Sequence, residues 1–153
     1  MNSKRRAVLK RSGGLLAAAA AGLLRPSQAL AQEWNKVAFG THTLAEAIKA
    51  LGGSGSTESK EIQIIAPDIA ENSAVVPISV ESRLPRTQAI AFVIEKNPSI
   101  LSANFDIPEG TDAFVTTRVK MAETSNVYAL VRADGRYFHA VKEIKVTAGG
   151  CGG

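Results

Sequence analysis

The chain has 153 residues, of which 18 are Lys or Arg and 14 are Asp or Glu, so its formal charge is +4. The excess of basic over acidic residues is confined to the first 31 residues. Without their six basic side chains, 12 basic residues remain against 14 acidic ones, a formal charge of −2. The remainder has no basic stripe with interleaved aromatic residues, which argues against a nucleic-acid-binding protein, and the length predicts one domain.

Residues 1–31 have the pattern of an export signal. The basic residues 4–10 contain the pair Arg5-Arg6, residues 13–24 are apolar and rich in Ala and Gly, and residues 29–31 form a small-x-small cleavage site. The arginine pair is typical of the twin-arginine (Tat) pathway, and an ordinary secretory signal is the alternative. Because the apolar stretch is too short to span a membrane well, we expect cleavage and an exported mature protein without stable membrane insertion.

The mature domain is expected to comprise residues 32–147, and one short helix is expected near its start. Thr43 is a good N-cap, Glu46 completes a capping-box pattern, and Gly52 suits the left-handed residue that ends many helices. The apolar stripe of this helix is Leu44, Ala47, Ile48 and Leu51. Residues 32–40, with the chain's one tryptophan, Trp34, are expected to be a short lead, and residues 52–56 a flexible linker.

From residue 60 onward, the apolar residues alternate as they do in β-strands. Seven strands are expected, at residues 61–66, 74–80, 87–95, 99–106, 113–121, 126–133 and 136–147. Asp134-Gly135 predicts a tight hairpin between the last two, and Pro77 predicts an edge strand or a bulge. The pattern predicts an all-β, antiparallel β-sandwich with one short N-terminal helix, and an open barrel is the alternative.

The C-terminal residues 148–153 contain the chain's one cysteine, Cys151, which Gly149, Gly150, Gly152 and Gly153 flank. Since glycine has the broadest backbone freedom, we expect these residues to form a flexible arm. Fully extended, residues 148–151 reach about 14 Å, at about 3.5 Å each. The arm is therefore long enough to insert a thiol into a cleft of another protein.

The surroundings of Cys151 favour a thiol on which other proteins act. No Lys, Arg or His is adjacent in sequence, whereas a catalytic cysteine needs a fixed base and an electropositive pocket. We therefore interpret Cys151 as the point of covalent substrate attachment, activated in the active site of a partner. The alternatives are a structural disulfide between two chains, a tag for conjugation and a thiol-dependent enzyme.

The rest of the chain has no recognisable catalytic or metal-binding pattern, so no cofactor or metal is expected. His42 and His139 lack a second histidine or a cysteine at ligand spacing, and no Gly-x-Ser-x-Gly or phosphate-binding loop is present. The acidic residues are expected to form a solvated face; they include Glu61, Asp68, Glu71, Asp106, Glu109 and Asp112.

Four segments resemble one family. Residues 66–77 read Ala-Pro-Asp-Ile-Ala-Glu-Asn-Ser-Ala-Val-Val-Pro, and with the Gly-Gly-Cys-Gly-Gly tail, the Tat-like signal and residues 141–147 they are similar to SoxY, the sulfur-carrier subunit of the Sox system. The resemblance covers residues 32–153. Ser73 departs from the glycine that many members of the family have at this position.

The resemblance implies an immunoglobulin-like β-sandwich in the periplasm, paired with a SoxZ-like β-sandwich subunit, with Cys151 bearing the substrate and no cofactor in the carrier. It also implies three enzymatic partners. A c-type cytochrome complex couples thiosulfate to the cysteine, a metal-dependent thiohydrolase releases sulfate, and a molybdenum-containing sulfur dehydrogenase oxidises the remaining sulfur. The apolar residues 74–80 are candidates for the partner interface.

Overall fold

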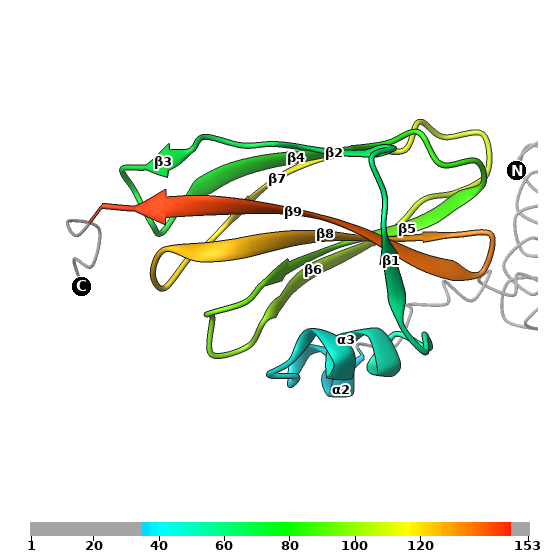
Figure 1. Cartoon of the computed structure of the whole chain (residues 1–153), viewed down its shortest axis with the longest axis horizontal. Helices are drawn as coiled ribbons and strands as arrows, with labels where there is room; N and C mark the ends of the chain where they lie inside the picture. Colours follow the sequence, from blue (N-terminus) through cyan, green and yellow to red (C-terminus); the bar gives the residue numbers. More distant parts are fainter. Residues whose placement is uncertain (1–34, 148–153) are drawn as a thin grey trace, which may run out of the picture. The chain divides into compact units, whose positions relative to one another are not determined.

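The computed structural model describes residues 35–147, which form two short helices and nine strands in two sheets (Figure 1). The expected signal at residues 1–31, Trp34 and the expected arm at residues 148–153 lie outside this range. No helix within it is long and apolar enough to cross a membrane. The elements are α2 (Lys36–Phe39), α3 (Leu44–Ala50), β1 (Ser56–Glu58), β2 (Ile62–Ile65), β3 (Ile69–Ala70), β4 (Val76–Ser82), β5 (Thr87–Ile94), β6 (Leu101–Asp106), β7 (Phe114–Val119), β8 (Ser125–Ala133) and β9 (Arg136–Val146).

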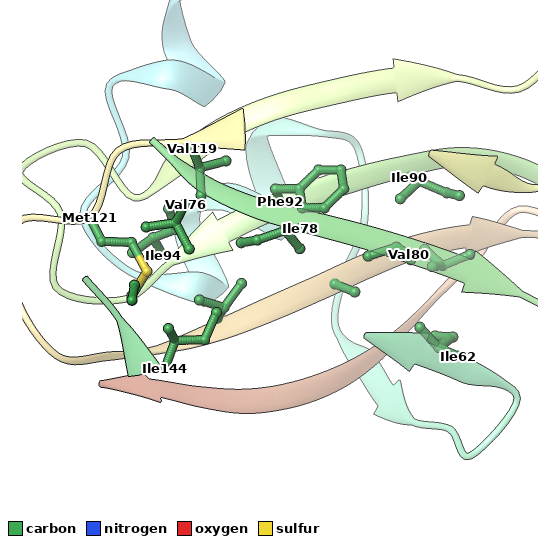
Figure 2. Close-up of a cluster of buried hydrophobic side chains, with 14 residues drawn as sticks. Ile62, Val76, Ile78, Val80, Ile90, Phe92, Ile94, Val119, Met121 and Ile144 are labelled. Atoms are coloured by element: carbon green, nitrogen blue, oxygen red, sulfur yellow. The ribbon is translucent and has the colours of Figure 1, made fainter. Parts of the chain in front are cut away.

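The two sheets pack face to face, as the alternating pattern predicts. The larger sheet has the order β1-β9-β8-β5-β6, with β3 also paired to β9, and the smaller has the order β2-β4-β7. Apolar side chains from both sheets fill the space between them, among them Ile78 from β4, Phe92 from β5 and Ile144 from β9 (Figure 2). Since the sheets do not close into one another, the immunoglobulin-like sandwich is confirmed and the open barrel is wrong.

The Asp134-Gly135 hairpin is confirmed, and it sets the register of β9. Asp134 and Gly135 have φ angles of 51° and 73°, the two positive values that a type I′ turn requires. The pairing of β8 with β9 runs without interruption from Ala133–Arg136 to Ser125–Ile144. This long ladder positions the C-terminal end of β9, from which the cysteine-bearing tail continues.

The prediction of an edge strand at Pro77 is wrong, because β4 lies between β2 and β7. The Ser82 N–H donates to the Ala113 carbonyl at 2.9 Å, so the backbone groups of Ser82 face β7. Because the direction alternates along a strand, the even-numbered residues of β4 face β7, and the backbone of Pro77 faces the side of β2. The pairing with β2 ends at Ser79. The Pro77 nitrogen therefore faces a position where no strand of the described residues requires a hydrogen-bond donor, and proline is tolerated in this central strand for that reason.

The chain between α3 and β4 crosses from one sheet to the other and back. β1 pairs in parallel with Tyr137–His139 of β9, β2 joins the smaller sheet, and β3 returns to pair in parallel with Lys145–Val146. The expected antiparallel arrangement holds for the other strand pairs. β1 and β3 were not predicted, because two or three residues are too few to show a period of two.

The predicted helix is present as α3, and its capping box is formed: the Thr43 hydroxyl accepts from the Glu46 N–H, and the Glu46 carboxylate accepts from the Thr43 N–H. Gly52 has the expected positive φ, 89°. A second helix, α2, replaces part of the expected lead; Asn35 caps it and also donates to the Ala50 carbonyl at 3.1 Å. The helices contribute Ala38, Ala47 and Ile48 to a second apolar cluster, which also includes Val93 and Leu130 of the larger sheet.

The expected flexible linker at residues 52–56 is wrong, because Gly53 is packed and Ser56 begins β1. A Cβ atom on Gly53 would lie 2.5 Å from Cδ2 of Tyr137 and 2.7 Å from Cγ2 of Ile48. The Tyr137 hydroxyl donates to the Leu51 carbonyl at 2.7 Å, which holds the ring in place. Glycine is therefore required at residue 53 for close approach.

We expect Gly53→Ala to lower the free energy of unfolding by about 1–3 kcal/mol, because the added methyl group overpacks a filled site. Gly55→Ala is the matched control: its Cβ would meet nothing within 4 Å, and Gly55 does not have a positive φ. Urea unfolding of the two variants measures the difference. Equal midpoints would contradict the packing assigned to Gly53.

Candidate functional site

The candidate attachment residue, Cys151, and the glycines of the expected arm, Gly149, Gly150, Gly152 and Gly153, lie outside the described residues. The structure describes the point from which they continue. We call residues 68–75 and 145–147 the tail base, because β3 pairs with the end of β9 and residues 71–75 follow β3 directly (Figure 1).

Hydrogen bonds from two directions fix the tail base to the domain. The Lys145 N–H donates to the Asp68 carbonyl at 2.9 Å, and the Thr147 N–H donates to the Ala70 carbonyl at 3.2 Å. The Val146 N–H donates to the Thr124 hydroxyl at 3.0 Å. The chain is therefore held in place up to Thr147, four residues before Cys151.

The segment that resembles the SoxY pattern, residues 66–77, supplies most of the tail base. The Asn72 side chain accepts from the Ala74 N–H at 3.0 Å, which forms a local turn. Ser73 is buried, and its carbonyl accepts from the Met121 N–H at 2.8 Å. The sequence singled out this segment but not its contact with the end of β9, since the paired residues lie 76 positions apart in the register Ile69–Lys145 and Ala70–Val146.

Lys142 joins the tail base to the middle of β9. Its ammonium group donates to the Ala66 carbonyl at 2.6 Å and lies 2.9 Å from a carboxylate oxygen of Asp68. The hydrogen bond from Lys142 holds the pKa of Asp68 below its usual value. All six acidic residues of the expected solvated face are exposed; they are Glu61, Asp68, Glu71, Asp106, Glu109 and Asp112.

Two apolar side chains are exposed at the tail base: Ile69 is 56 % exposed and Val75 is 47 % exposed. By contrast, Val76 is fully buried and lies in the core between the sheets (Figure 2). Residues 74–80, the candidate partner interface, therefore do not present one continuous apolar surface, because β4 alternates its side chains between core and solvent. The interface stays a prediction for the side chains that face solvent.

The two histidines lie apart and serve in local contacts. Nδ1 of His42 lies 2.8 Å from the Pro98 carbonyl oxygen, and Nδ1 of His139 lies 2.9 Å from the Ser56 hydroxyl oxygen. Within residues 35–147, no group of three or more His, Cys, Asp or Glu side chains is placed to hold a metal ion.

Comparison with known proteins adds a family match. A family model described as sulfur oxidation protein SoxY matches residues 48–151, a range that ends at Cys151. The structure of the sulfur carrier protein SoxY from Chlorobium limicola f thiosulfatophilum is similar, with 41 % sequence identity and a TM-score of 0.62 over 68 % of this chain and 96 % of that one.

A weaker likeness is to superoxide reductase (neelaredoxin) from Ignicoccus hospitalis, with 21 % identity and a TM-score of 0.49 over 56 % of this chain and 80 % of that one. No curated protein sequence matches the chain.

Proposed function

Because the chain belongs to the SoxY family of sulfur oxidation proteins, we propose that it carries sulfur intermediates covalently on Cys151 and presents them to partner enzymes. The observation that supports this most directly is that the family match runs to Cys151, the one thiol of the chain. A relative with 41 % identity is itself a sulfur carrier protein. In this proposal the chain has no cofactor and no turnover of its own.

The proposed loading step forms one S–S bond. The terminal sulfur of thiosulfate joins Sγ of Cys151, and one proton and two electrons leave, the electrons going to a c-type cytochrome partner. A thiohydrolase then cleaves the bond to the sulfonate group with water and releases sulfate, which leaves a sulfane sulfur on the cysteine. A sulfur dehydrogenase then oxidises this sulfur to a sulfonate, taking three oxygen atoms from water and passing six electrons to an electron-acceptor protein. A second hydrolysis releases sulfate and restores the thiol.

The fixed tail base suits this role. Since the chain is held up to Thr147, every docking event starts from the same point, and residues 148–151 extend at most about 14 Å from it. An enzyme that acts on Sγ must therefore cover the surface around Thr147. The exposed Ile69 and Val75 lie in the tail base, and we include them in the partner contact.

The proposal extends to location and assembly. Residues 1–31 direct Tat export to the periplasm and are removed, residues 32–147 form the body of the carrier, and residues 148–153 form its flexible arm. The body pairs with a SoxZ-like β-sandwich subunit.

Intact-mass analysis of the mature protein tests the proposal. After incubation with thiosulfate and the cytochrome partner, we expect the mass of one thiosulfate group to be added to the peptide that contains Cys151, and a reductant to remove it. Disulfide-linked chains as the sole product, or additions to other peptides, would contradict the carrier role and favour a structural cysteine.

A further inference from the structure

The smaller sheet ends at β7, and no strand of the described residues pairs with the outer side of β7 (Figure 1). On its inner side β7 pairs with β4, in a register that runs without a shift from Val76–Val119 to Glu81–Phe114. β7 contains neither a proline nor a bulge, and Arg118 is its one charged residue, so it has few of the features that protect sheet edges from other chains. We call the unpaired side of β7 the β7 edge.

The hydrogen-bonding pattern identifies the backbone groups on the β7 edge. The Ala113 carbonyl accepts a hydrogen bond from β4, so the backbone groups of Ala113 face β4. Because the direction alternates along a strand, the backbone groups of Phe114, Thr116 and Arg118 face away from β4. The Phe114 N–H is already used, since it donates to the Asp112 carbonyl at 2.8 Å. The β7 edge therefore offers the N–H groups of Thr116 and Arg118 and the carbonyl groups of all three residues.

The side chains of β7 are incompletely covered on both faces of the sheet. Phe114 is 51 % exposed, and Thr116 and Arg118 are exposed on the same outer face. On the inner face, Val115 packs against the core but is only half-buried, whereas Val80, its partner on β4, is fully buried. A strand added at the β7 edge would therefore bury further apolar surface as well as pair the free backbone groups.

The sequence of β7 is complementary to itself in one antiparallel register. When two copies of β7 pair about a two-fold axis at Thr116, the two Thr116 residues lie opposite each other. In the same register, Phe114 of each copy lies opposite Arg118 of the other copy. Two threonines form a favourable cross-strand pair, and an arginine beside an aromatic ring gains a cation–π contact. This complementarity identifies a second copy of the chain as the occupant that fits the β7 edge.

We propose that two copies of this chain pair through their β7 edges, which joins the two smaller sheets into one sheet with the strand order β2-β4-β7-β7-β4-β2. The Thr116 N–H of each copy donates to the Thr116 carbonyl of the other copy. The Arg118 N–H of each copy donates to the Phe114 carbonyl of the other copy. The pairing uses neither the tail base nor Cys151, so it goes beyond the proposed carrier function and does not depend on it.

Sedimentation equilibrium of the mature protein, with Cys151 kept reduced to exclude a disulfide, measures the pairing. We expect the apparent mass to rise from one chain to two as the protein concentration rises from micromolar to millimolar. Over the same range, hydrogen exchange at the amides of Thr116 and Arg118 should slow. Exchange at the amides of Val115 and Thr117, which face β4, should not change.

Exchanging two exposed side chains tests the register. Phe114→Arg places an arginine opposite Arg118 of the other copy, and each dimer contains two such pairs, so we expect the dissociation constant to rise at least about tenfold. The double variant Phe114→Arg with Arg118→Phe restores an arginine–phenylalanine pair on both sides of the axis. Its dissociation constant should return close to that of the unsubstituted protein. Since both side chains are exposed, the thermal midpoints of the two variants should stay unchanged.

The proposal is overturned if the reduced protein stays monomeric at millimolar concentration, or if exchange at the amides of Thr116 and Arg118 does not depend on concentration. It is also overturned if the double variant pairs as weakly as Phe114→Arg. Displacement of the second copy by a SoxZ-like subunit that protects the same two amides would assign the β7 edge to that subunit, and would overturn the proposal as well. Should Phe114→Arg fail to fold, the concentration dependence of exchange in the unsubstituted protein still decides.

Discussion

Cys151→Ser is expected to abolish sulfur loading, with no thiosulfate adduct on the intact protein and no sulfate released by the reconstituted partner enzymes. The chain has no second cysteine to take over the role. A serine hydroxyl cannot form the S–S bond on which the proposed cycle depends. Because the substitution replaces one sulfur by oxygen four residues beyond the held part of the chain, we expect the thermal midpoint to be unchanged.

The unchanged midpoint is the control that separates lost chemistry from lost structure. Intact mass and sulfate release are measured on the same preparation, alongside the unsubstituted protein. Sustained sulfate release by the serine variant would contradict the carrier role. Full activity of a protein whose thiol has been capped by alkylation would contradict it as well, and would favour the alternative of an assembly module.

The sequence correctly predicted the helix cap and the hairpin turn, whose conformations depend on neighbouring residues. The capping box of Thr43 and Glu46 and the turn at Asp134-Gly135 each depend on residues within four positions, and both are confirmed. The alternation of β7 is also confirmed, with Thr117 half-buried and Thr116 and Arg118 exposed.

The features that the sequence did not predict depend on distant partners. Pro77 is tolerated in a central strand only because β2 ends opposite Ser79, which no local pattern shows. In the sequence, Gly53 has the pattern of a linker residue, and only the structure shows that Tyr137 packs against it. β3 is recognised as a strand because it pairs with the end of β9.

The candidate site likewise has one part that the local sequence predicts and one part that depends on distant contacts. Cys151 and its glycines are evident from composition alone, whereas the tail base depends on the pairing of Ile69 and Ala70 with the end of β9, far along the chain. The sequence also treated Val75 and Val76 alike, as apolar residues of one candidate interface. The structure separates them, with Val75 47 % exposed and Val76 fully buried.

This separation gives a matched pair of substitutions with opposite expected effects. Val76→Asp places a carboxylate in the core beside Val119 and Met121, so we expect it to lower the free energy of unfolding by about 4 kcal/mol or more. Since the whole domain has a stability of about 5–15 kcal/mol, this variant should melt about 15–30 °C lower.

Val75→Asp should leave the free energy of unfolding within about 0.5 kcal/mol of the unsubstituted value, because the side chain is half exposed. If Val75 contacts the enzymes that act on Cys151, a charge there should weaken their binding by about tenfold or more, since a desolvated apolar contact would be replaced by an unpaired carboxylate. Thermal unfolding and titration with each purified partner measure the two effects separately. Undiminished binding by a folded Val75→Asp variant would remove Val75 from the contact, while a Val76→Asp variant as stable as the unsubstituted protein would contradict the inward orientation of β4.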